Sequence, residues 1–134
     1  GVHEYCNFLK SVQDARKIRA GVVNCFERAS FNDLTSEERR RYLTFCVIGA
    51  GPSGVEMASE LRTFIEEDGP KYYPELLKDV RIKVIEAAGS VLAPFHKELQ
   101  EEAIRKLNSE SNIKGSKSRE LLPPHFSMSE VMLE

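Results

Sequence analysis

The sequence TFCVIGAGPSGVEMASELRTFI, residues 44–65, joins an apolar run to an amphipathic run through three spaced glycines. The first run, Thr44 to Ile48, is continuously apolar or β-branched, which predicts a central parallel strand buried on both faces. After the glycines, one helical stripe collects the apolar residues Val55, Ala58, Leu61 and Ile65. The hydrophobic period therefore changes from that of a strand to that of a helix at residues 49–54.

Each glycine of this turn has its own expected role. Gly49 permits a tight turn out of the strand, Gly51 lets a pyrophosphate approach the backbone, and Gly54 lets the helix pack closely on the strand. The helix start adds unpaired N–H groups and the positive end of the helix dipole. The pattern predicts dinucleotide binding.

A second strand is predicted by the alternating run from Val80 to Ile85, which ends at Glu86. A carboxylate there is the expected partner of the adenosine ribose hydroxyls. Glu86 lies farther from the glycines than the usual ~20 residues. We interpret the polar segment 66–74, with its Gly and Pro, as an inserted loop that accounts for the extra length. The predicted fold class is α/β: an incomplete Rossmann-type β-α-β dinucleotide-binding fold preceded by helices.

Composition narrows the function classes. The 134 residues are enough for one domain, and the formal charge of -2 argues against a nucleic-acid partner held by bulk electrostatics. No apolar run approaches the ~20 residues of a membrane span. The chain begins with Gly, so we interpret it as a piece of a longer protein.

The cysteines and the other reactive side chains form no catalytic or metal-binding pattern. Cys6, Cys25 and Cys46 are widely spaced, which predicts a reducing compartment and neither a metal site nor a disulfide. Cys46 is expected to be buried in the first strand as a small hydrophobe. No nucleophile or acid–base constellation is present, so no catalytic residue is predicted.

The N-terminal region is predicted to be helical from Tyr5 to Phe26, as one amphipathic helix or two joined at Gly21. A basic membrane-surface helix is the alternative, although acidic residues dilute its charge. Thr35 and Glu38 are spaced for a capping box before a short helix that ends at Tyr42.

The C-terminal third departs from a complete Rossmann pattern. A helix is predicted for residues 97–107, with Leu99, Ala103 and Leu107 on one face, and a polar stretch follows it. Because Pro123 and Pro124 cannot donate to a ladder, we expect no central third strand near residue 121, which leaves a two-strand sheet with uncovered apolar faces. The predicted organisation is a helical lead-in (1–42), a partial nucleotide-binding domain (43–107) and a divergent, disordered tail (108–134), with a binding peptide as the alternative for the tail.

Several segments resemble one known family. Residues 4–10, 14–19 and 49–56, the acidic insertion with its tyrosines, and the strand end Val84-Ile85-Glu86-Ala87 are similar to type II (alternative, non-proton-pumping) NADH dehydrogenases of mitochondria. The similarity extends from the N-terminus to Leu107. That family implies an FAD domain interrupted by an NADH domain, of which this chain carries the first half. The FAD-binding glycine motif and the quinone region are not found in these residues.

The resemblance implies an oxidoreductase of respiratory electron transport that passes hydride from NADH to FAD and electrons to ubiquinone. It also implies peripheral attachment to the mitochondrial inner membrane through regions outside these residues, and it is compatible with a homodimer. The implied pyrophosphate site comprises Gly49, Gly51, Pro52, Ser53 and Gly54. Glu86 would bind ribose and disfavour the extra phosphate of NADPH, whereas Glu56 would either lie beside the nicotinamide and flavin or be an exposed helix carboxylate.

Three other interpretations stay open from the sequence. The chain can be a truncated nucleotide-binding module without redox activity, in which case it binds nucleotide but no flavin. It can be a non-catalytic or regulatory remnant that docks onto the full enzyme. A related two-dinucleotide-fold flavoprotein reductase of another class shares the same glycines and Glu86.

Overall fold

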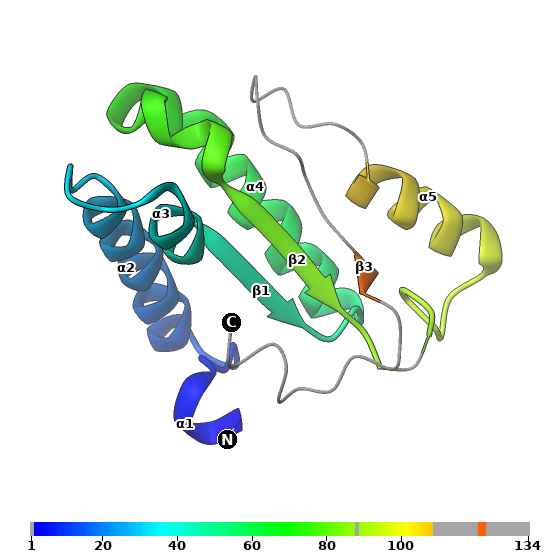
Figure 1. Ribbon diagram of the computed structural model, residues 1–134. Coiled ribbons are helices and arrows are strands. Elements are labelled where there is room, and N and C mark those ends of the chain that lie inside the picture. The colour runs from blue at the N-terminus through cyan, green and yellow to red at the C-terminus, as the bar shows by residue number, and fades with distance from the viewer. Residues whose placement is uncertain (1, 88, 109–120, 123–134) are drawn as a thin grey trace. The chain divides into compact units, whose positions relative to one another are not determined.

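The computed structural model describes residues 2–87, 89–108 and 121–122, which fall into two compact units, Gly1–Leu43 and Thr44–Glu134. The first unit holds helices α1 (Val2–Tyr5), α2 (Val12–Ala29) and α3 (Ser36–Tyr42) (Figure 1). The second unit holds β1 (Thr44–Ile48), α4 (Pro52–Tyr72), the 3-10 helix η1 (Pro74–Asp79), β2 (Arg81–Ile85), α5 (Lys97–Asn108) and β3 (Leu121–Leu122). The predicted tail residues 109–120 and 123–134 lie outside the described residues.

Helix α2 begins later than the sequence predicts and is not divided. Ser11 caps it and forms a capping box with Asp14, so the predicted start at Tyr5 is wrong. The cap fixes the first turn because the Ser11 hydroxyl accepts from the Asp14 N–H. The helix continues through Gly21, so the structure has one helix here and not two joined at Gly21.

Among the apolar residues of α2, only those in its C-terminal half are buried. Val22, Phe26 and Ala29 of α2 are buried, whereas Phe8 and Leu9 lie before the helix and are exposed. Thr35 and Glu38 form the predicted capping box at the start of α3, since each residue's side chain accepts a hydrogen bond from the other's backbone N–H. The short helix therefore begins where the sequence predicts, to within one residue.

The second unit contains a parallel sheet of strand order β1-β2-β3. The expectation of a two-strand sheet is wrong, because Leu121 and Leu122 pair in parallel with Val84 and Ile85 of β2. Pro123 and Pro124 follow Leu122 in the sequence and lie outside the described residues. In the described sheet β3 is an edge strand.

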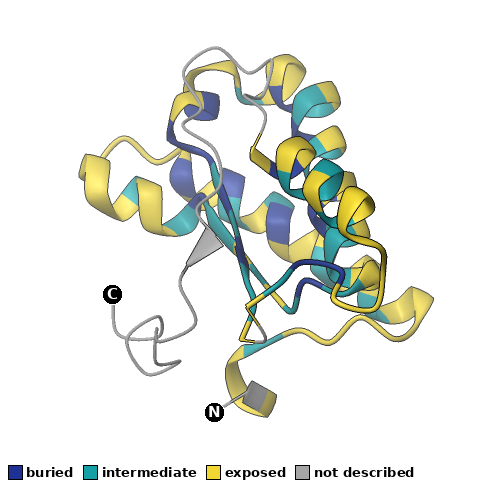
Figure 2. Ribbon diagram, turned by 90° about the vertical axis from the view of Figure 1, so that its right-hand side faces the viewer, coloured by how far each residue is buried: buried dark blue, intermediate teal, exposed yellow. Residues whose placement is uncertain are grey.

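The prediction that β1 is buried on both faces is also wrong. Parallel pairing joins Phe45 to Ile82 and Val47 to Val84, and in β2 these alternate positions are buried against the face that carries α4. Cys46 lies on the other face and is exposed, so it is not the buried hydrophobe that its strand position predicts. The physical reason is that successive side chains of a strand point to opposite faces, and α4 covers only one of them. Figure 2 shows the buried residues as dark blue segments of the ribbon.

Residues 66–74 do not form the predicted irregular insertion. Helix α4 continues to Tyr72 with Pro70 inside it, and η1 follows from Pro74. Gly69 is buried, and a β-carbon there would lie 2.5 Å from Cδ2 of Leu77, so the helix packs directly on η1 at this position. The large spacing between the glycines and Glu86 therefore comes from added helical turns.

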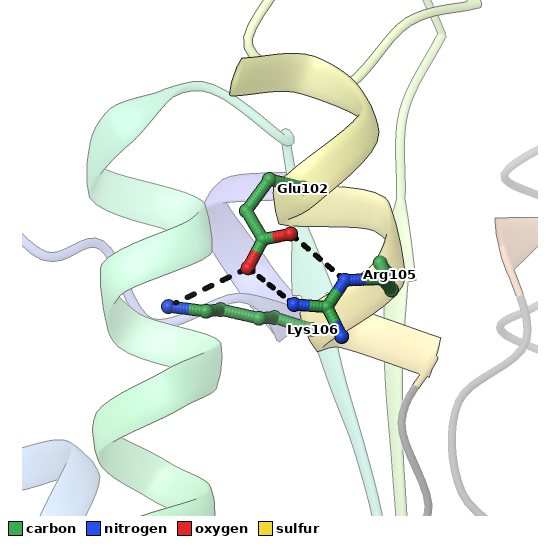
Figure 3. Close-up of polar contacts among 3 residues, drawn as sticks. All are labelled: Glu102, Arg105 and Lys106. Carbon is green, nitrogen blue, oxygen red and sulfur yellow. Dashed lines mark hydrogen bonds and ion pairs between the residues drawn. The ribbon is translucent and has the colours of Figure 1, made fainter. Parts of the chain in front are cut away.

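Helix α5 spans the predicted residues but exposes more of its apolar face than expected. Leu107 is buried, whereas Leu99 is 46% exposed. On its polar face Glu102 accepts two hydrogen bonds from Arg105 and lies 3.9 Å from Nζ of Lys106 (Figure 3). These pairs are close to solvent, so they contribute little to the stability of the unit. Within the described residues, no helix has the length and apolarity needed to cross a membrane.

Candidate functional site

The glycine turn lies where β1 ends and α4 begins, at the carboxyl end of two parallel strands. Gly49 follows Ile48 directly, and its N–H donates to the carbonyl of Ile85 at 2.8 Å. Pro52 is the first residue of α4, with Gly51 as its N-cap. In open α/β sheets, ligands bind at the carboxyl ends of the strands.

Gly49 and Gly54 are each required by the geometry of the turn. Gly49 has φ +99°, a conformation that side-chain-bearing residues rarely adopt. A β-carbon at Gly54 would collide with the carbonyl oxygen of Gly49 and would lie 3.7 Å from Cγ1 of Val47. Close approach of helix and strand therefore requires glycine at residue 54.

Gly51 differs because no other described residue crowds it. Apart from its own chain neighbours, no atom of the described residues lies within 4 Å of the position that a β-carbon at Gly51 would take. Its φ of -71° is open to any residue, so neither packing nor backbone conformation demands glycine there. The bare backbone at this point is open to a group from outside the chain.

The first turn of α4 carries no side-chain cap. Gly51 has no side chain to accept from the helix N–H groups, and Pro52 has no N–H at the first helical position. Pro52 and Ser53 are exposed. The backbone N–H groups of Ser53 and Gly54 thus lie at the positive end of a helix of 21 residues, an arrangement suited to an anion.

The fold brings Glu86 to the glycine turn. Glu86 follows β2 directly, and its Oε2 accepts a hydrogen bond from the N–H of Ala50 at 2.7 Å, a contact between residues 36 positions apart. The carbonyl of Ala50 in turn accepts from the N–H of Leu92 at 2.8 Å. A carboxylate and the glycine turn therefore share one edge of the sheet.

Glu56 lies apart from this contact network. It stands in α4 just after the first turn, and its side chain is exposed. No hydrogen bond or ion pair joins it to the other predicted site residues in the described part of the chain. The structure thus brings together Gly49, Gly51, Pro52, Ser53, Gly54 and Glu86, and places Glu56 on the same helix beyond them.

Two residues of this turn's surroundings are missed from the sequence. Ala50 lies between Gly49 and Gly51 and is buried, which its place between the two glycines could have suggested. Leu92 carries no signal: a leucine with φ +52° is not expected from any local pattern. Within the described residues, no group of three or more His, Cys, Asp or Glu side chains is placed to hold a metal ion.

Sequence comparison places this arrangement in a family. The profile of the pyridine nucleotide-disulphide oxidoreductases matches residues 1–118, so the chain belongs to that family. Its relatives include external alternative NAD(P)H-ubiquinone oxidoreductase B2, mitochondrial, of Arabidopsis thaliana, which is 47% identical over 81% of this chain and 19% of the relative. The probable NADH-ubiquinone oxidoreductase C3A11.07, mitochondrial, of Schizosaccharomyces pombe is 39% identical over 92% of this chain and 26% of the relative.

A solved structure supports the same relationship. NDH2 from Plasmodium falciparum, solved in complex with NADH, superposes with a TM-score of 0.77 and 28% identity over 81% of this chain and 22% of that chain. The resemblance to type II NADH dehydrogenases that the sequence indicates is confirmed by these relatives, and so is the α/β fold class. The chain spans about a fifth to a quarter of the length of these relatives.

Proposed function

We propose that this chain binds NADH at the glycine turn and forms part of an FAD-dependent type II NADH:quinone oxidoreductase. The single observation that carries the proposal is the meeting of an uncapped helix start, an uncrowded Gly51 and the carboxylate of Glu86 at one sheet edge. Residues 43–107 are the part of the chain to which we assign binding.

The pyrophosphate is assigned to the turn. The uncapped N–H groups of Ser53 and Gly54 donate to its oxygens, and the missing side chain at Gly51 allows the close approach. Pro52 sets the helical φ at the first position without presenting a donor of its own. Gly49 and Gly54 keep the turn tight against the strand.

The adenosine ribose is assigned to Glu86. A carboxylate accepts hydrogen bonds from both ribose hydroxyls, and its negative charge opposes the extra phosphate of NADPH, so NADH is the favoured ligand. The family resemblance assigns Glu56 to the nicotinamide side of the site, and Glu56 is an exposed residue of α4 just after its first turn. Glu56→Gln tests this assignment by removing the charge at an exposed position, with the rate of flavin reduction by NADH in the full-length enzyme as the readout.

The chemistry of the whole enzyme requires partners beyond this chain. NADH, when bound, supplies the hydride that reduces FAD, and the electrons then pass to ubiquinone. The residues described here bind and orient; none is assigned a proton transfer or a covalent step. By its relatives, whose names place them in mitochondria, we assign the parent enzyme to mitochondria. The family resemblance further implies a peripheral protein of the inner membrane and is compatible with a homodimer.

Isothermal titration of the 134-residue chain with NADH and NADPH tests the binding proposal. The chain is expected to bind NADH at least about tenfold more tightly than NADPH, which corresponds to about 1.4 kcal/mol. Glu86→Arg should narrow or reverse this ratio, because the guanidinium attracts the extra phosphate. Glu67→Arg makes the same charge change at an exposed position of α4 and should leave the ratio unchanged.

Two outcomes would contradict the proposal. One is a folded chain, verified by circular dichroism, that binds neither nucleotide. The other is an NADH to NADPH affinity ratio that Glu86→Arg leaves as in the unmodified chain. The first result would reject the site and the second would reject the ribose assignment alone.

A further inference from the structure

Ala50 is held through both of its backbone groups by the segment that follows β2. Its N–H donates to Oε2 of Glu86 at 2.7 Å, and its carbonyl accepts from the N–H of Leu92 at 2.8 Å. Ala50 itself is only 1% exposed. The middle of the glycine turn is therefore fixed by two residues that lie far along the chain.

The bond to Glu86 is the stronger kind of contact. A carboxylate that accepts from a backbone N–H forms a charge-assisted hydrogen bond, roughly twice as strong as one between neutral groups. The contact is half-buried, where solvent screens it less than on an open surface. In the described part of the chain the N–H of Ala50 donates only to Glu86, so losing the carboxylate would leave a buried donor unsatisfied.

Leu92 adopts an unfavourable conformation to make its contact. Its φ is +52°, although it is not a glycine, and its side chain is 8% exposed. Burial of the Leu92 side chain and the hydrogen bond to Ala50 hold the Leu92 backbone in the left-handed conformation. The turn at Leu92 is thus shaped to meet the glycine turn.

We propose that Glu86 is a positioning residue for the glycine turn, acting through Ala50, in addition to contacting ribose. Leu92 secures the opposite side of the same residue. This inference rests on the proposed function, since it takes the ligand to be a dinucleotide. It requires that loss of Glu86 weaken binding of ligands that have no ribose hydroxyls for Glu86 to contact.

A ligand cycle separates the two roles. The 134-residue chain and Glu86→Ala are each titrated with NADH and with a dideoxy analogue that lacks both hydroxyls of the adenosine ribose. We expect Glu86→Ala to weaken binding of the analogue by about tenfold, the effect of one charge-assisted hydrogen bond. Equal affinity of both proteins for the analogue would mean that Glu86 acts on ribose alone and would overturn the proposal.

Amide hydrogen exchange in the ligand-free chain gives a readout that does not depend on nucleotide. The Ala50 amide should exchange at least about tenfold faster in Glu86→Ala than in the unmodified chain, because its acceptor is lost. Glu67→Gln, an exposed change on α4 that removes one charge, should leave the Ala50 rate unchanged. An Ala50 rate that ignores Glu86 would overturn the positioning role.

The failures of the two proposals are distinguishable. If the unmodified chain binds no nucleotide, the proposed function fails, whereas the exchange result still decides the positioning role. If Glu86→Ala does not fold, Glu86→Met replaces it, because methionine keeps an unbranched side chain of similar length but offers no oxygen acceptor to the Ala50 N–H. Faster Ala50 exchange in Glu86→Met supports the proposal, and an unchanged rate overturns it.

Discussion

Gly54 lies so close to Gly49 that a β-carbon at residue 54 would collide with the carbonyl oxygen of residue 49. The contact is between helix α4 and the residue that leaves β1, and the atom in the way is backbone, which cannot rotate aside. The two glycines are thus coupled. The turn at Gly49 brings its carbonyl oxygen against α4, and only glycine at residue 54 leaves room for that oxygen.

Gly54→Ala should therefore destabilise the second unit by about 1–3 kcal/mol, as overpacking of a tight contact does. Urea unfolding followed by circular dichroism measures the change. NADH affinity should fall as well, because the start of α4 must move away from the strand. An alanine variant with unchanged unfolding free energy would show that the helix can shift without cost.

Gly51→Ala should separate binding from stability. The position has open space around it, and replacing a glycine N-cap by alanine costs less than about 1 kcal/mol, so folding should be nearly unaffected. NADH affinity should fall by more than about tenfold, because the new methyl group occupies the approach to the backbone. Urea unfolding measures the stability of the variant, and titration calorimetry measures its NADH affinity. Retained affinity would contradict the pyrophosphate assignment.

Pro70→Ala should raise the stability of α4. Proline in a helix interior removes one hydrogen bond and costs about 3 kcal/mol, partly offset by the entropy it removes from the unfolded chain, so a gain of about 1–2 kcal/mol is expected. Thermal unfolding gives the comparison. Pro74→Ala is the matched control, since Pro74 begins η1, where proline is well tolerated, and no gain is expected. A Pro70→Ala variant no more stable than Pro74→Ala would disprove the explanation.

The capping box of α3 should weaken in acid. The hydroxyl and the backbone N–H of Thr35 both donate to Glu38 and lower the pKa of its carboxyl below the ordinary 4.5. A lowered pKa in the folded state means that the box stabilises the helix above pH 4.5 and loses its contribution as the pH falls through the folded value.

Thr35→Val tests the cause. Removing the hydroxyl should raise the pKa of Glu38 toward its ordinary value, measured by NMR titration of the side-chain carboxyl. The pKa of Asp14, lowered by the hydroxyl of Ser11 and by backbone N–H groups in the box of α2, should stay where it is. A Glu38 titration that does not respond to Thr35→Val would assign the shift to another source.

The sequence predicts the elements of the site because each depends on local chemistry. Glycines at residues 49, 51 and 54, an apolar run before them and a carboxylate at the end of the next strand are readable in order. The capping box of Thr35 and Glu38 is equally local and is confirmed. Which residues hold NADH remains a prediction of that pattern.

The predictions that fail are those that depend on what lies across the fold. Gly69 and Pro70 are local helix breakers, but the packing of Gly69 on Leu77 keeps α4 helical beyond them. Cys46 has the sequence neighbours of a buried strand residue but is exposed, because its own run does not state which face of the strand α4 covers.

By itself the sequence determined the β-α-β order, the turn glycines and the family, since these are carried by side-chain type and spacing along one stretch. Only the tertiary structure decided that β3 pairs with β2 and that Glu86 and Leu92 both meet Ala50. The physical reason is that a hydrogen bond between residues 36 positions apart depends on strand register and on how the helix between them packs. No local propensity encodes either one.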